Sequence, residues 1–181
     1  IEQLLADPDI DVVHNCTPNN LHLPINLKII AAGKHDFSEK PLARTAAESA
    51  QMLKALKARP KVVAGVNFCY RMNPLALEMK ARIKNGEIGR PLVVQGTYLQ
   101  DWLLYDTDYS WRIEEEAGGP SRCVADIGSH WMDLAQNLTG AKITSVCADT
   151  FIAHPVRKKP TGAVETFSKN ASAEYTEVPV T

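Results

Sequence analysis

Runs of apolar residues alternate with helical patterns through the first 70 residues of the chain. Extended runs are expected over residues 10–15, 35–38 and 62–68, and helical patterns over 21–32 and 46–58. Gly33 stands where helices commonly end in glycine, and Thr45 with Glu48 has the spacing of a capping box. Apolar strands in this order favour a parallel sheet covered by helices on both faces. Residues 1–70 are therefore predicted to form the second half of a doubly wound, Rossmann-like α/β domain.

The pattern changes after residue 70. One amphipathic helix is expected over residues 74–84 and another near 126–138, with strands over 91–100 and 142–152 and two extended pieces beyond 153. Asn85-Gly86 and Gly140 mark the two helix ends. A loop as long as residues 103–121 is usually functional or disordered in a compact domain. Residues 71–181 are therefore predicted to begin an α+β domain with an open, mostly antiparallel sheet.

Composition excludes several classes of partner. The chain has 181 residues, is 45% hydrophobic and carries a formal net charge of −1. It can bury a core, and it has no basic field for nucleic acid or an anionic membrane surface. No apolar run approaches the roughly 18 residues of a membrane span, and the first residues of the sequence lack the basic region and the cleavage pattern of a secretory signal. These features predict a cytoplasmic protein with a small-molecule ligand.

The four cysteines are widely spaced. Cys16, Cys69, Cys123 and Cys147 form no CxxC pair. This spacing favours reduced, buried thiols over disulfides or a zinc site. No metal site is therefore predicted.

The beginning of the chain suggests a missing upstream part. The first residue is Ile1, and none of the ten glycines belongs to a GxGxxG fingerprint that follows a strand. Dinucleotides bind mainly at that fingerprint and at the helix that follows it. We therefore expect these residues alone to bind cofactor weakly and to be inactive.

Four motifs together resemble one enzyme family. They are Thr17-Pro18-Asn19-Asn20-Leu21-His22, Gly33-Lys34-His35 leading to Glu39-Lys40-Pro41, Tyr70-Arg71-Met72-Asn73-Pro74, and Gly118-Gly119 followed by Asp126-Ile127-Gly128-Ser129-His130. Their order and spacing resemble the glucose-fructose oxidoreductase / inositol dehydrogenase (Gfo/Idh/MocA) family over roughly residues 1 to 149. The chain departs from the family pattern in lacking the upstream fingerprint and in ending within the expected second sheet.

The resemblance implies an oxidoreductase that uses NAD or NADP. Hydride would pass between the nicotinamide and a hydroxyl-bearing carbon of a sugar, polyol or cyclitol. Two alternatives stay open: a relative that uses NAD to eliminate or hydrolyse a glycosidic bond without net redox, and a non-catalytic nucleotide-sensing regulator. The family also implies a homo-oligomer assembled through the second-domain sheet.

Lys40 is the first candidate catalytic residue. It follows a predicted strand end, where open α/β sheets place their ligands. Glu39 could hold the ammonium group or a ribose hydroxyl, although Lys40 could also be a solvated surface residue. The resemblance implies that Lys40 orients the substrate hydroxyl and tunes the acid–base group.

Asp126 and His130 are the other two catalytic candidates. Four residues apart on a helix, they would share a face, so that the carboxylate could orient the imidazole. The resemblance gives His130 the acid–base role and Asp126 a role in binding the substrate hydroxyl. Two alternatives stay open. Asp126 could cap the helix while His130 packs in the core, or Asp126, His130 and Asp133 could be metal ligands.

The resemblance also implies which residues face the cofactor and the substrate. Those expected at the cofactor are Thr17, Pro18, Asn19, His22, Glu39, Lys40, Tyr70, Arg71, Trp111 and Arg112. Those expected at the substrate are Lys40, Trp102, Asp126 and His130. From the residues alone, the first segment could be an ordinary polar loop that caps a helix, and the tryptophans could simply fasten the long loop.

Overall fold

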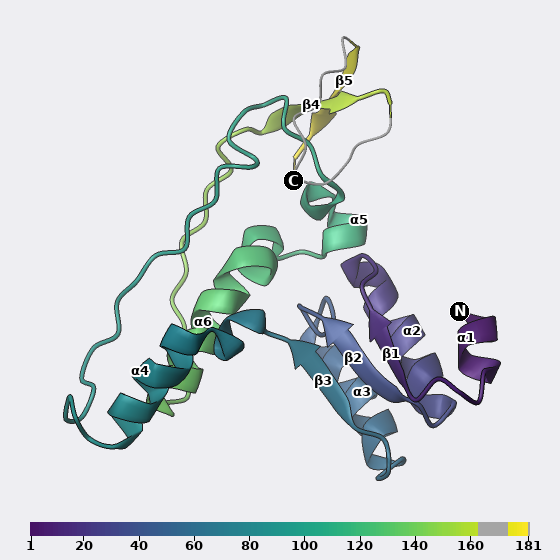
Figure 1. Ribbon diagram of the computed structural model, residues 1–181. Coiled ribbons are helices and arrows are strands. Elements are labelled where there is room, and N and C mark those ends of the chain that lie inside the picture. The colour runs from purple at the N-terminus through teal and green to yellow at the C-terminus, as the bar shows by residue number, and fades with distance from the viewer. Residues whose placement is uncertain (163–173, 181) are drawn as a thin grey trace.

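The computed structural model describes residues 1–162 and 174–180. It contains a three-stranded parallel sheet with two covering helices, a pair of packed helices, and a two-stranded antiparallel ribbon (Figure 1). The short helix α1 (Glu2–Ala6) precedes the sheet. Within the described residues, no helix combines the length and apolar character needed to cross a membrane.

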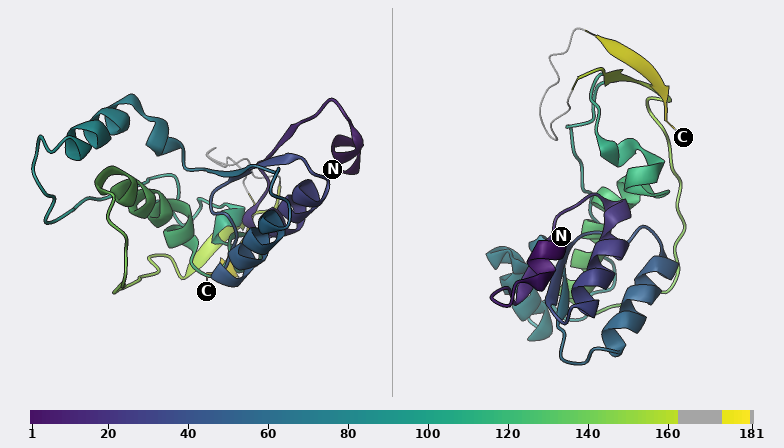
Figure 2. Two further views of the ribbon diagram at one scale, coloured as in Figure 1. Left: turned by 90° about the horizontal axis from the view of Figure 1, so that it is seen from below. Right: turned by 90° about the vertical axis from the view of Figure 1, so that its right-hand side faces the viewer.

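The parallel sheet has the order β1-β2-β3, formed by β1 (Val12–Asn15), β2 (His35–Glu39) and β3 (Ala64–Asn67). The helices α2 (Asn19–Ala31) and α3 (Ala46–Lys57) connect the strands and lie side by side on one face (Figure 2). The predicted α/β order is confirmed, and Thr45 caps α3 as its spacing indicated.

Among the described residues, helices cover one face of the sheet, and the other face, which the doubly wound fold would also cover, is open. Val12 is 54% exposed and Phe37 is 38% exposed, whereas Val13 and Ser38 on the helix side are buried. The burial of β1 alternates because neighbouring side chains point to opposite faces and only one face has helices on it.

A polar network joins the covered face of the sheet to α2. Asn26 is fully buried in α2; its amide nitrogen donates to Ser38 Oγ (2.9 Å), and its amide oxygen accepts from Asn15 Nδ2 (2.6 Å). Ile29 and Ile30 complete the buried face one helical turn further along. Buried amides with satisfied hydrogen bonds fix the register of α2 on the strands.

A helix pair follows the sheet. Helix α4 (Pro74–Lys84) has the predicted bounds, and the Asn73 side chain caps it by accepting from the Leu75 amide. Helix α6 (Ser129–Thr139) packs beside α4 and ends at Gly140, which adopts a φ of +73°. A π-helical turn (Val124–Gly128) leads directly into α6.

Two predicted strands are absent from the described structure. Residues 91–100 and 142–152 are extended but form no ladder, and Leu92 (84% exposed) and Val146 (77% exposed) project into solvent. A strand requires hydrogen bonds from a neighbour, and no described segment supplies them here. The residue pattern of these two segments therefore led to a wrong prediction for both.

The antiparallel ribbon orders the long loop. Strands β4 (Val156–Pro160) and β5 (Tyr175–Pro179) are the two extended pieces expected beyond residue 153. The buried guanidinium of Arg157 on β4 donates to the carbonyl oxygens of Leu103, Tyr105 and Asp108. The loop also contains a 3₁₀ turn (Trp111–Ile113) and the single helical turn α5 (Glu115–Gly118).

Candidate functional site

The carboxyl ends of the three parallel strands converge on one edge of the sheet. β1 ends at Asn15, β2 at Glu39 and β3 at Asn67, and the motif residues Thr17 and Lys40 follow the first two ends. Ligands of open α/β sheets bind at this edge. The local fold therefore positions two of the sequence motifs together.

Lys40 reaches from this edge to the second part of the chain. Its ammonium group donates to Asp126 Oδ1 (2.6 Å) and to the Asp126 carbonyl oxygen (2.7 Å). The two side chains are 15% and 17% exposed, and Arg112 Nε lies 3.4 Å from the same carboxylate oxygen. Two predicted site residues that are 86 positions apart are thus in direct contact. Lys40 is bound to Asp126 and is no solvated surface residue.

His130 lies in a pocket of aromatic rings. The ring of Tyr70 is 4.7 Å from the imidazole, and those of Phe68 and Tyr98 are each 6.0 Å away, centroid to centroid. Nδ1 is buried and has no hydrogen-bond partner in the described part of the chain. Burial lowers the pKa of His130, and the positive charge of Lys40 lowers it further. The imidazole is therefore neutral at neutral pH and able to accept a proton.

Asp126 does not orient the imidazole as its spacing predicted. Its carboxylate contacts Lys40 and Arg112, and no described carboxylate hydrogen-bonds to His130. The π-helical turn explains the difference, because its hydrogen bonds join residues five apart and residues four apart no longer stack above one another. Such turns occur frequently at functional sites.

Hydrogen bonds to neighbouring residues hold the segment after β1 in place. Asn15 Oδ1 accepts from the Thr17 hydroxyl (2.7 Å), and Asn19 Nδ2 donates to the Gly118 carbonyl oxygen (2.9 Å). His22 is fully buried, with its ring nitrogens 2.7 Å from the Pro41 carbonyl oxygen and 2.8 Å from that of Thr17. His22 therefore ties this segment to the turn after Lys40, which differs from the direct cofactor contact that was expected. Pro18 stands at the start of α2.

Glu39 lies on the open face of the sheet. Its Oε1 accepts from Asn67 Nδ2 (2.7 Å) and lies 3.2 Å from His14 Nε2. The expected contact with the Lys40 ammonium group is absent among the described residues, because that group bonds to Asp126 instead. Glu39 is the last residue of β2, at the edge of the sheet where β1 also ends.

Tyr70 and Arg71 connect the sheet to α6. The Tyr70 hydroxyl hydrogen-bonds to that of Tyr98, and this bond together with burial raises the pKa of Tyr70 to about 12. Arg71 forms an ion pair with Asp133, with Nε donating to Oδ2 (2.7 Å). Tyr70 reaches His130, whereas the guanidinium of Arg71 is bound to α6.

A cavity of about 420 Å³ opens beside Asp126. Trp102 and Arg112 line it together with Asp126. The Arg112 guanidinium lies 4.5 Å from the ring of Trp111 and 5.6 Å from that of Trp102, so the aromatic residues hold the cation in place. Trp102 and Arg112 thus line the cavity and also fasten the loop. The sequence had offered these two roles as alternatives.

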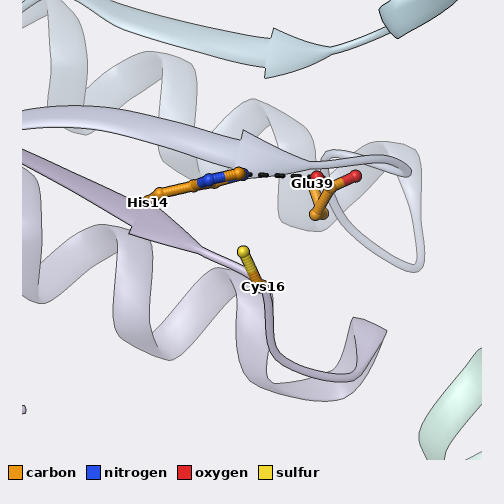
Figure 3. Close-up of side chains that lie close together, drawn as sticks. All are labelled: His14, Cys16 and Glu39. Carbon is orange, nitrogen blue, oxygen red and sulfur yellow. Dashed lines mark hydrogen bonds and ion pairs between the residues drawn. The ribbon is translucent and has the colours of Figure 1, made fainter.

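One group of side chains was not predicted from the sequence. His14, Cys16 and Glu39 each place a possible ligand atom within 4.8 Å of the others (Figure 3). His14 is 25 positions from Glu39, and the strand register brings them together. The alternating pattern of β1, which puts His14 on the open face, was the available signal. The predicted burial of the cysteines is wrong, since all four are exposed; they are free thiols.

Two family models match the chain. Residues 1–68 match the model described as an oxidoreductase family with an NAD-binding Rossmann fold, and residues 76–174 match the model of the GFO/IDH/MocA C-terminal domain. Together the matches extend over most of the chain.

Several characterised proteins are similar to the chain. Levoglucosan dehydrogenase from Pseudarthrobacter phenanthrenivorans is 44% identical over 138 residues, which are 76% of this chain and 35% of that protein. The 1,5-anhydro-D-fructose reductase from Ensifer adhaerens is 38% identical over 74% of this chain and 39% of its own length. This chain thus spans 35 to 39% of the length of these two relatives.

Solved structures agree with these similarities. Levoglucosan dehydrogenase in complex with NADH and levoglucosan has a TM-score of 0.73 and 43% identity, covering 77% of this chain and 37% of that one. An inositol dehydrogenase homologue from Azotobacter vinelandii, complexed with NAD⁺, has a TM-score of 0.70 and 26% identity over 87% and 38% of the two chains. The fold and the family motifs therefore agree.

Proposed function

Because this chain belongs to the GFO/IDH/MocA oxidoreductase family, we propose that it forms part of an NAD-dependent dehydrogenase. The substrate would be a sugar, polyol or cyclitol, which is oxidised at a secondary hydroxyl group. Similar proteins are named for levoglucosan, 1,5-anhydro-D-fructose and inositol, which supports this substrate class.

One observation carries the proposal. The Lys40 ammonium group binds Asp126, and this contact supports a single site formed by the turn after β2 and the segment leading into α6. His130 follows in that segment with a neutral imidazole, because burial and Lys40 lower its pKa. A cation and a neutral base in one site are the groups that alcohol oxidation requires.

The edge of the sheet fits a nicotinamide cofactor. Dinucleotides bind in this fold at the carboxyl ends of the strands. Five of the expected cofactor residues lie at or just after these ends: Thr17, Pro18, Asn19, Glu39 and Lys40. The chemistry supplied by bound NAD is acceptance of the hydride from the substrate carbon. NAD is proposed in place of NADP because the two similar structures described above hold NADH or NAD⁺.

The residues of the chain would supply binding and proton transfer. Lys40 donates a hydrogen bond to the reacting oxygen and stabilises negative charge as the hydroxyl proton leaves. His130 takes that proton. Asp126 and Arg112, which share the Lys40 contact and line the cavity, bind the neighbouring hydroxyl groups of the substrate.

Transfer of hydride from the substrate to NAD⁺ tests this proposal directly. The full-length protein that contains this chain is incubated with NAD⁺ and a panel of anhydrosugars, aldoses and inositols, and NADH formation is followed by absorbance. A substrate deuterated at the carbinol carbon should yield deuterated NADH. The variant Lys40→Met removes the ammonium charge, and the variant His130→Gln removes the proposed base.

Three outcomes separate the classes of function. NADH formation with deuterium transfer supports the dehydrogenase. Cleavage of a glycosidic bond without net NADH places the protein among the relatives that use NAD transiently. Cofactor binding without turnover of any panel member would identify a nucleotide-sensing protein. Assembly through the second-domain sheet stays a prediction, and sedimentation of the full-length protein measures it.

A further inference from the structure

Three potential metal ligands stand on the open face of the sheet, outside the Lys40 and Asp126 contact. His14 projects from β1, Glu39 from the end of β2, and Cys16 follows β1 (Figure 3). Imidazole, thiolate and carboxylate are the three ligand types of protein-bound zinc. The proposed dehydrogenase chemistry uses neither His14 nor Cys16.

The spacing of the ligand atoms approaches that of a zinc site. Zinc–nitrogen and zinc–oxygen bonds of about 2.0 to 2.2 Å put two ligand atoms about 3.4 Å apart at the tetrahedral angle, and a zinc–sulfur bond of about 2.3 Å puts sulfur about 3.6 Å from the others. His14 Nε2 and Glu39 Oε1 are 3.2 Å apart, and one possible ligand atom from each of the three residues lies within 4.8 Å of the other two. These separations therefore exceed the distance of about 3.6 Å expected in a zinc site by at most about 1.2 Å.

Neighbouring residues hold two of the ligands in place. The ring of His14 packs on Phe37 with centroids 4.8 Å apart, and Asn67 Nδ2 donates to Glu39 Oε1 at 2.7 Å. Gly65 leaves room for Phe37, because a Cβ at that position would lie 3.3 Å from the ring. Partners of this kind orient metal ligands and raise metal affinity.

An ion could reach this group from solvent. His14 and Cys16 are exposed and Glu39 is half-buried, which leaves a fourth coordination position for water. The group also borders the proposed cofactor site, since Cys16 precedes Thr17 and Glu39 precedes Lys40.

We propose that His14, Cys16 and Glu39 bind Zn²⁺ and that the bound ion excludes the nicotinamide cofactor. The exclusion rests on the cofactor position proposed above, whereas the metal site does not. Coordination would occupy Glu39 and place a divalent ion beside the Thr17 segment. Zinc would then be a reversible inhibitor of the enzyme that competes with NAD.

Cobalt provides a readout of the metal site that is independent of activity. Co²⁺ added to the full-length protein should produce the near-ultraviolet charge-transfer band of a cobalt–thiolate bond, and Zn²⁺ should displace it. Loss of a partner outside the ligand shell lowers metal affinity by about 10- to 100-fold. We therefore expect at least about 10-fold weaker zinc binding in Asn67→Ala and more than about 100-fold in Cys16→Ser.

The matched control is Cys147→Ser, which removes another exposed thiol. This variant should keep both the band and the zinc affinity. Absence of the band in the unmodified protein, or zinc affinity unchanged in Cys16→Ser, would overturn the metal site.

Competition is measured separately by NADH fluorescence. Zinc at ten times its own dissociation constant should raise the apparent Kd of NADH about 11-fold in the unmodified protein, and much less in Cys16→Ser. An unchanged NADH affinity in the presence of the cobalt–thiolate band would overturn the exclusion. Failure to bind NADH without any metal would instead refute the proposed function and leave the metal site supported by its own band.

Discussion

Replacing Asp36 with asparagine should stabilise the protein at neutral pH. Asp36 lies on the covered face of β2, is 3% exposed, and neither carboxylate oxygen has a hydrogen-bond partner in the described chain. Burial raises its pKa from 3.8 to about 6. Ionising the side chain in the folded state is therefore costly.

The size and direction of the effect follow from this pKa. One pKa unit corresponds to about 1.4 kcal/mol, so the difference between 3.8 and about 6 amounts to about 3 kcal/mol at pH 7. Below about pH 4 the carboxyl is protonated in both the folded and the unfolded state, and the penalty vanishes. As pH rises through about 4 to 6 the unfolded chain releases its proton first, so stability falls and the full penalty is present above about pH 6.

Urea unfolding of the full-length protein at several pH values measures this penalty. The variant Asp36→Asn should be more stable than the unmodified protein by up to about 3 kcal/mol at pH 7, and this gain should shrink toward pH 4. Asp9→Asn, at an exposed aspartate, is the control and should show no such trend. Parallel pH dependence in Asp36→Asn and the unmodified protein would refute the reasoning.

Three further predictions concern the site. Lys40→Met should lower turnover by about 100-fold or more, with a smaller loss of NADH affinity, in steady-state kinetics; unchanged turnover would make Lys40 structural. Histidine NMR should show the pKa of the His130 imidazole below its ordinary value, and Lys40→Met should raise that pKa by removing the repelling charge; the same titration in both proteins would contradict an effect of the Lys40 charge on His130. Gly118→Ala should destabilise the protein by about 1 to 3 kcal/mol in urea, because the added Cβ would lie 2.6 Å from the Arg112 carbonyl oxygen. Gly162→Ala, where the added Cβ would meet no atom of the described residues within 4 Å, is its control.

Elements with local signals were predictable from the sequence. Helix α4 has its predicted bounds because Asn73 caps one end and Asn85-Gly86 terminates the other, and each signal acts within a few residues. The parallel order of the sheet followed from the alternation of strands and helices. The proximity of Lys40 to Asp126 was accessible only through the family motifs, since no local rule relates residues so far apart.

Features that depend on distant partners were predicted less well. Residues 91–100 have the composition of a strand, but a ladder needs a neighbour that composition does not specify. The proximity of His14 to Glu39 depends on strand register, and the burial of His22 depends on the carbonyl groups that surround its ring. The missing carboxylate contact of His130 arises from a π-helical turn, for which the spacing of Asp126 and His130 gives no sign.

The bond between Lys40 and Asp126 also sets an order of events during synthesis. Its two residues are 86 positions apart, and a ribosome adds about 5 to 20 residues per second. Asp126 is therefore made about 4 to 17 s after Lys40. During that interval a nascent sheet can already have its strand ends in place, while the Lys40 ammonium group still lacks its carboxylate. A growing chain therefore cannot assemble the proton-transfer site before the segment that leads into α6 has been translated.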